Sequence, residues 1–126
     1  MFIFFDFDGT LVDITERWWR LHLDVAREFS LPHYTERADY VDQKKNGVPE
    51  KTIMQKIAAD ADIIMAYDQE RVRRIELPEY LLYDKLFFDT ITTLSALRAQ
   101  NRVLAIVTKR RSRAVLNQQL DQLNLR

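Results

Sequence analysis

The sequence predicts an α/β fold in which short parallel strands alternate with helices, and two observations carry this prediction. Segments 2–5 and 103–107 are continuous apolar runs, FIFF and VLAIV. Unbroken apolar runs of this length are typical of parallel strands covered on both faces. Between and after these runs, apolar residues recur at spacings of three and four, which is typical of helices. We therefore expect a parallel sheet that is buried between helices.

The chain between the two apolar runs is predicted to be helical. Apolar stripes indicate helices over about 14–29, 35–45, 49–61 and 64–75, with breaks near Pro32, Gly47 and Pro78. Residues 13–83 are therefore expected to form an all-helical insertion, and residues 1–12 and 84–126 an α/β core. Within the core, Asp89 is placed to cap one helix, and a last helix follows the second strand.

Composition excludes several classes of protein. Nineteen basic and nineteen acidic residues balance to a net charge of zero, so no charge excess indicates binding to nucleic acid or to an anionic membrane. Cysteine is absent, which excludes disulfides, thiol catalysis and zinc–thiolate sites. The apolar start, Met1–Phe5, is too short for a signal peptide or a spanning helix. We expect a cytoplasmic protein.

The motif with the clearest chemistry follows the first apolar run, in the sequence FFDFDGTLV. Asp6 and Asp8 are separated by one residue, so both carboxylates are expected on the same side at the strand end. Two like charges placed together need a cation or a shared proton, and Mg²⁺ would supply the cation. Gly9 permits a sharp turn. The amides there and the Thr10 hydroxyl are candidate donors to a phosphate oxygen.

This motif resembles the first motif of the haloacid dehalogenase superfamily of hydrolases. The resemblance implies a Rossmann-like core with an inserted helical cap. It also implies that Asp6 attacks phosphorus to form an aspartyl-phosphate, and that Asp8 protonates the leaving alcohol and then activates water. Magnesium would be held by the Asp6 carboxylate and the Asp8 backbone carbonyl.

A second match to that family lies after the second apolar run. The family places a serine or threonine there, whose hydroxyl and following amide hold the phosphoryl group, and this implies phosphate binding by Thr108 and Lys109. Lys109 begins a basic run that includes Arg110, Arg111 and Arg113. We interpret this run as a solvated first helical turn, because long basic side chains extend readily into water.

The first motif has two rival interpretations, and the residues disfavour both. A calcium-binding loop needs a glutamate at its twelfth position, and counting from Asp6 this position is Arg17. A dehalogenase is disfavoured by Asp8, since those relatives generally lack the second aspartate.

The resemblance covers the whole chain but only half of the family pattern. The lysine of the third motif and the acidic pair of the fourth would come after Arg126, so we expect a truncated form of a longer protein. The predicted function is hydrolysis of a small phosphorylated metabolite, as in phosphoglycolate-phosphatase-like enzymes, with little or no activity in this form. The alternative is a non-catalytic remnant that binds metal or phosphate, or an interaction module. An incomplete core leaves strand edges open, so self-association is also expected.

Overall fold

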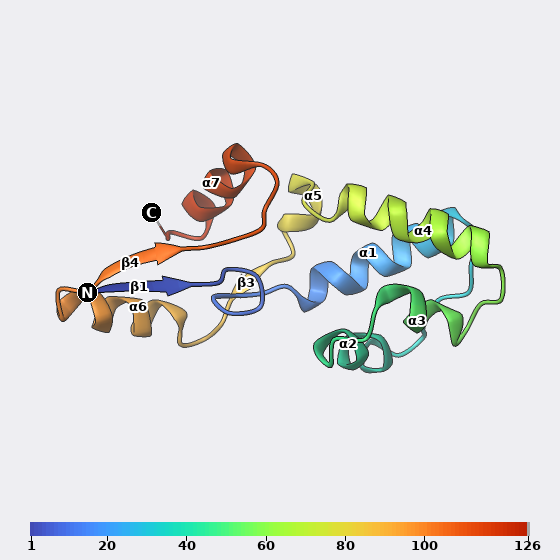
Figure 1. Cartoon of the computed structure of the whole chain (residues 1–126), viewed down its shortest axis with the longest axis horizontal. Helices are drawn as coiled ribbons and strands as arrows, with labels where there is room; N and C mark the ends of the chain where they lie inside the picture. The colour runs from blue at the N-terminus through green and yellow to red at the C-terminus, as the bar shows by residue number, and fades with distance from the viewer. Residues whose placement is uncertain (126) are drawn as a thin grey trace. The chain divides into compact units, whose positions relative to one another are not determined.

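The computed structural model describes residues 1–125, which form two units that are treated separately below. Unit 1 comprises Met1–Ile14 and the chain from Leu82 onward, and unit 2 comprises Thr15–Leu81. The helical unit begins and ends two residues inside the expected insertion of 13–83. Unit 1 contains strands β1 (Phe2–Phe5), β2 (Val12–Asp13), β3 (Lys85–Leu86) and β4 (Val103–Ile106), with helices α6 (Thr90–Ala99) and α7 (Arg113–Gln122) (Figure 1).

The two apolar runs of the sequence form one parallel pair, β1 and β4. The register places Phe2 beside Val103 and Phe5 beside Ile106. The ladder extends past the strand ends, where the Val107 amide donates to the Phe5 carbonyl at 2.8 Å. The prediction of an α/β fold with parallel strands is confirmed, and the carboxyl ends of both strands meet at one edge of the sheet.

The prediction that both faces of this sheet are buried is wrong. Phe2 and Phe4, which lie on one face of β1, are 66% and 65% exposed. Their rings stack with centroids 6.5 Å apart. Val103 on β4 is also exposed. An apolar sequence shows that a strand can be buried. Whether its faces are covered depends on other helices and strands packing against them. Within residues 1–125 this sheet has only two strands, and its Phe2–Phe4 face stays open.

The chain leaves and re-enters unit 1 through a second, very short pair of strands. β2 and β3 run antiparallel, with Val12 beside Leu86 and Asp13 beside Lys85. The Leu11 carbonyl accepts hydrogen bonds from the Phe87 amide at 3.3 Å and from the Thr90 hydroxyl at 2.8 Å. Strands of two residues carry no readable apolar pattern, so the sequence did not predict them. They tie the segment after the first motif to the start of α6.

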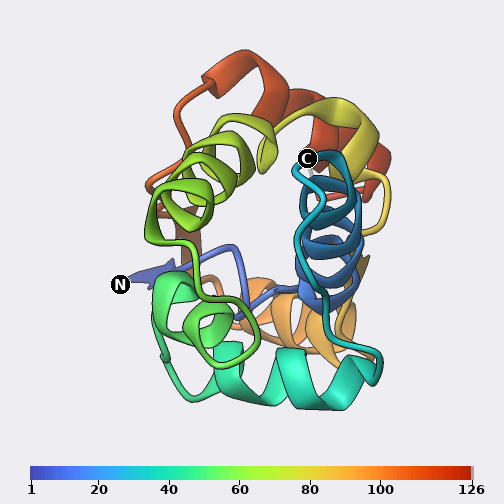
Figure 2. The same cartoon turned by 90° about the vertical axis from the view of Figure 1, so that its right-hand side faces the viewer.

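Unit 2 contains five helices in sequence, α1 (Thr15–Glu28), α2 (Arg37–Lys45), α3 (Glu50–Gln55), α4 (Ala61–Arg74) and α5 (Pro78–Leu81) (Figures 1 and 2). Gly47 ends α2 with φ +75°, a conformation that favours glycine. The core is formed by buried apolar residues from α1, α3, α4 and α5, including Leu21, Val25, Met54 and Ile64. No helix in the described part of the chain is both long and apolar enough to cross a membrane.

A buried chain of hydrogen bonds runs through unit 2. The Tyr34 amide donates to His22 Nε2 at 3.1 Å, so the neutral ring carries its proton on Nδ1. That nitrogen lies 2.9 Å from the Tyr67 hydroxyl, and Tyr67 donates to Glu50 Oε1. Tyr40 donates to the same oxygen at 2.7 Å, and its ring stacks on His22. Burial lowers the pKa of His22 to about 4, more than the nearby Glu50 charge raises it. His22 is therefore neutral in the folded protein near pH 7.

Glu50 is the buried charge on which this network converges. Its side chain is 3% exposed, and Lys44 Nζ lies 3.0 Å from Oε2 while Arg71 Nε lies 3.8 Å from Oε1. Burial raises the pKa of Glu50, but the charges of Arg71 and Lys44 and the tyrosine hydrogen bonds outweigh it, and the net shift is downward. The carboxylate therefore stays ionised because two cations face it.

Candidate functional site

The first motif forms a tight turn directly after β1. The Phe7 carbonyl accepts hydrogen bonds from the amides of Thr10, Leu11 and Val12 at 3.2, 3.0 and 3.3 Å. Gly9 takes φ +80°, a left-handed conformation that glycine adopts without strain. The fully buried Phe7 ring anchors the turn. Asp6 and Asp8 are its neighbours in the chain.

The two aspartates of the motif differ in environment. Asp6 is exposed, and its Oδ1 accepts a hydrogen bond from the Phe7 amide at 2.9 Å. Asp8 is partly buried, and both of its carboxylate oxygens accept hydrogen bonds from Arg110. The Arg110 Nε–Oδ2 distance is 2.7 Å and the Nη2–Oδ1 distance is 2.8 Å. The exposed carboxylate suits a nucleophile, and the held carboxylate suits a group that must keep one orientation.

The structure adds a second cation to the electrostatic argument made from the sequence. That argument called for a cation or a shared proton beside two neighbouring carboxylates and offered Mg²⁺ as the cation. Arg110 supplies a cation to Asp8 through its guanidinium group, and the Arg110 side chain is only 3% exposed. The expectation that the basic run is wholly solvated is wrong at Arg110, whereas Lys109 and Arg111 are exposed as expected. The bidentate pair with Asp8 holds the Arg110 side chain at this partly buried site, whereas a basic side chain without such a partner would extend into water.

The second motif lies where the parallel register predicts. Thr108 follows the end of β4, at the sheet edge from which Asp6 emerges, and it is partly buried. Its Oγ1 accepts a hydrogen bond from the Arg110 amide at 3.2 Å. Helix α7 begins later, at Arg113, with Ser112 accepting from the Val115 amide at 3.2 Å. Arg110 thus contacts a residue of each motif, Asp8 through its side chain and Thr108 through its backbone.

Two donors that the sequence suggested for phosphate serve the turn instead. The Gly9 amide donates to the Val12 carbonyl at 2.9 Å, and the Thr10 amide donates to the Phe7 carbonyl. Both residues are exposed. The donor that remains at this position for a phosphate oxygen is the Thr10 hydroxyl.

Two further polar residues of this region were missed by the sequence reasoning. Gln119 on α7 accepts a hydrogen bond from Arg110 Nη2 at 2.9 Å and donates to Asp84 Oδ2 at 2.7 Å. Both residues are buried. An amide inside a helix and an acid after a helical segment carry no distinctive pattern. The one feature that could have indicated them is that an arginine, once buried, needs more than one hydrogen-bond acceptor.

Few side chains of the described region could hold a divalent cation together. Among residues 1–125, no group of three or more histidine, aspartate or glutamate side chains is placed to hold a metal ion. Asp6 offers an exposed carboxylate, and Asp8 offers a backbone carbonyl. Mg²⁺ keeps several waters and needs only one or two protein carboxylates, so these oxygens fit a partial, weakly held site.

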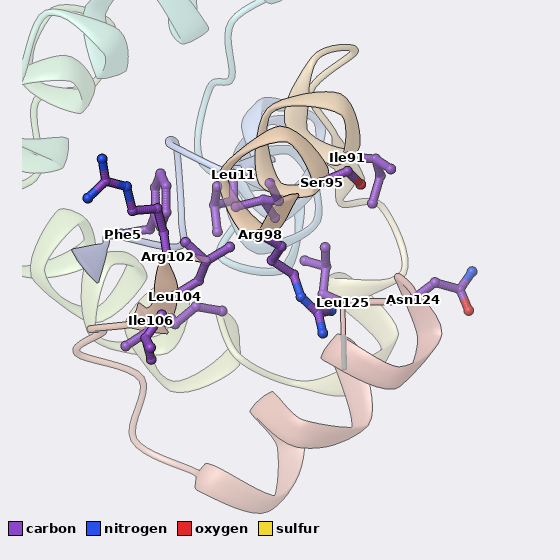
Figure 3. Close-up of a pocket in the computed structure, with 13 residues that line it drawn as sticks. Phe5, Leu11, Ile91, Ser95, Arg98, Arg102, Leu104, Ile106, Asn124 and Leu125 are labelled. Atoms are coloured by element: carbon purple, nitrogen blue, oxygen red, sulfur yellow. The ribbon is translucent and has the colours of Figure 1, made fainter. Parts of the chain in front are cut away.

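A pocket of about 530 Å³ lies elsewhere in unit 1, between the sheet and α6 (Figure 3). Phe5, Leu104 and Ile106 come from the strands, and Ile91, Ser95 and Arg98 come from α6. Neither aspartate of the first motif lines it, nor does Thr108. Its lining mixes apolar side chains with Arg98 and Arg102, and it is not the candidate site.

Comparisons with known proteins agree with this fold. A family model for haloacid dehalogenase-like hydrolases matches residues 3–126. A solved haloacid dehalogenase-like hydrolase from Streptococcus pneumoniae is similar at 22% identity and a TM-score of 0.70, with 97% of this chain and 55% of that chain covered. A candidate phosphatase from Clostridium difficile is similar at 16% identity and a TM-score of 0.72, with 97% and 54% covered. The chain spans about half the length of these structures. No curated protein matches the sequence.

Proposed function

This chain belongs to the haloacid dehalogenase-like hydrolase family, and from this premise we propose that it is built for hydrolysis of small phosphate monoesters. The observation that carries the proposal is the common edge of the parallel pair. Asp6, Asp8 and Thr108 all follow the carboxyl ends of β1 and β4. In open α/β sheets, ligands bind beyond these ends. Small phosphorylated metabolites are the proposed substrates, and Thr15–Leu81 is the proposed cap that selects among them.

In the proposed reaction, an Asp6 oxygen attacks phosphorus, an Asp6–phosphorus bond forms, and the bond from phosphorus to the alcohol oxygen breaks. Asp8 gives its proton to that alcohol oxygen. Water then attacks phosphorus, Asp8 takes the proton from this water, and the bond to Asp6 breaks. Thr108, the Lys109 amide and Thr10 are proposed to hold the phosphate oxygens, and Gly9 to shape the turn. In this motif the Asp6 carboxylate is exposed and the Asp8 carboxylate is held by Arg110, and this difference supports the division of roles.

Members of this family typically use Mg²⁺. In this chain the Asp6 carboxylate and the Asp8 carbonyl are the proposed ligands. Bound there, the cation would lessen the repulsion between the Asp6 carboxylate and the phosphate. With no acidic cluster among the described residues and no lysine assigned to the nucleophile, we propose weak turnover for the 126-residue chain. Preorganised charge is often the largest catalytic contribution, and here it is reduced.

The alternative is a module that binds metal or phosphate without turnover. The arrangement that favours it is the engagement of both Asp8 oxygens by Arg110. Phosphate release from small monoesters with Mg²⁺ separates the two. Turnover that disappears in Asp6→Asn and falls about 10²–10⁴-fold in Asp8→Asn supports the hydrolase, the second figure being the usual contribution of a general acid. No release by any form, together with Mg²⁺ affinity that Asp6→Asn abolishes, supports the binding module.

A further inference from the structure

Arg110 holds Asp8 with more contacts than charge balance requires. Its Nε and Nη2 each donate to a different oxygen of Asp8, at 2.7 and 2.8 Å. This two-point contact fixes both the position and the plane of the carboxylate, which a lysine ammonium would not do. A carboxylate oxygen that accepts one hydrogen bond retains a second lone pair. The contact therefore fixes the orientation of the Asp8 carboxylate.

The guanidinium is itself held in place. Gln119 Oε1 accepts from Nη2 at 2.9 Å, and the Gln119 amide in turn donates to Asp84, whose side chain is fully buried. Asp84 Oδ2 lies 3.8 Å from Nη2, so a second carboxylate balances the cation. The guanidinium carbon also lies 5.5 Å from the centroid of the Phe7 ring. The side chain is 3% exposed. The guanidinium is therefore held by contacts on Asp8, Gln119 and Phe7.

The backbone of the same residue reaches the second motif. The Arg110 amide donates to Thr108 Oγ1 at 3.2 Å. The Thr108 oxygen accepts this bond, and the hydroxyl retains its one donor hydrogen. One residue therefore orients a carboxylate of the first motif and a hydroxyl of the second. Asp8 and Thr108 come from segments about a hundred positions apart in the chain.

We propose that Arg110 is a positioning residue that sets the orientations of Asp8 and Thr108 together, with Gln119 and Asp84 as its brace. This inference rests on the proposed function, since it assigns Asp8 the role of proton donor to the leaving alcohol. It predicts a specific kinetic defect. Alkyl phosphates need a proton on the leaving oxygen, whereas p-nitrophenolate leaves readily without one. Misplacing Asp8 therefore slows alkyl phosphates more than p-nitrophenyl phosphate.

The test compares Arg110→Lys, Gln119→Leu and the control Arg113→Lys, an exposed position at the start of α7. For glycerol phosphate, kcat of Arg110→Lys should fall at least tenfold with KM within about twofold, and for p-nitrophenyl phosphate it should fall less than threefold. Gln119→Leu should show the same selectivity more weakly. In this variant the guanidinium still contacts Asp8, but it has lost the hydrogen bond to Gln119. If the role of Arg110 were purely structural, Arg110→Lys would lower kcat equally for both substrates, and that result would overturn the proposal.

A second measurement is independent of turnover. In NMR spectra of the full chain, Arg110→Lys and Gln119→Leu should each shift the resonances of Asp8 and Thr108 together, and Arg113→Lys should shift neither. Shifts confined to one of the two motifs would show that Arg110 does not link them, and the proposal fails. If the wild-type chain hydrolyses neither ester while the joint shifts are present, the proposed function fails and the linkage stands. Circular dichroism establishes that each variant is folded.

Discussion

The two units of this chain both bury charged groups, but they differ in how far their apolar surfaces are covered. Unit 2 buries a polar network, from His22 through Tyr67 to Glu50, inside a closed helical core. Unit 1 leaves the Phe2–Phe4 face of its sheet open and buries its charges around Arg110, at the candidate site. The difference teaches that one set of buried ion pairs belongs to the stability of a helical unit and the other to the proposed chemistry.

The largest expected effect tests whether the buried charge of unit 2 is structural. Glu50→Ala leaves Lys44 and Arg71 without their buried partner, and we expect a loss of about 3–5 kcal/mol in the free energy of unfolding. The measurement is urea unfolding followed by fluorescence of Trp18 and Trp19, which both lie in unit 2.

Glu16→Ala is the matched control, because Glu16 also pairs with two cations, Arg20 and Arg37, but on the surface. Its loss should stay below about 1 kcal/mol. Equal losses in the two variants would show that burial does not distinguish these ion pairs.

The next effect uses pH to break the same network. The pKa of His22 is about 4 in the folded protein and about 6.5 in the unfolded chain, so between these values the unfolded chain binds more protons. Stability is therefore fully present above pH 6.5 and falls as pH is lowered through 4, by about 3 kcal/mol over this range. Urea midpoints from pH 7 to pH 4 measure the effect.

His22→Gln, which keeps a hydrogen-bonding side chain, should lose this part of the pH dependence. The comparison uses the slope with pH, because the substitution itself also changes stability. Parallel slopes for wild type and variant would assign the acid sensitivity to other groups.

The smallest effect concerns the open face of unit 1. We expect copies of the chain to associate through Phe2 and Phe4, since exposed apolar strands recruit other chains. Phe2→Ser combined with Phe4→Ser should weaken self-association at least tenfold, or about 1.4 kcal/mol. Sedimentation measures it. Leu82→Ser, at a residue 71% exposed outside the strands, is the control and should change nothing. Equal association in the double variant and the wild type would exclude this face.

The sequence predicted the parallel pair because continuous apolar runs such as Phe2–Phe5 are unusual outside strands of this kind. It did not predict their exposure, because coverage is decided by other segments. It placed Asp6, Asp8 and Thr108 at one sheet edge, since parallel register requires this arrangement. It missed the partnership of Arg110 with Asp8, because the pairing spans 102 positions and only the folded chain brings the two together.

The same separation has a consequence for how the chain folds. β1 is made first, yet its partner β4 is encoded about a hundred positions later. Contacts between the helices of unit 2, such as Arg17 with Ile75, span less of the chain than the pairing of β1 with β4. Contacts of shorter sequence separation form faster. Unit 2 is therefore expected to fold before β1 pairs with β4, so the first motif forms its site later than the helices fold. A nascent chain would hold its aspartates in a site only after nearly all of these residues had emerged.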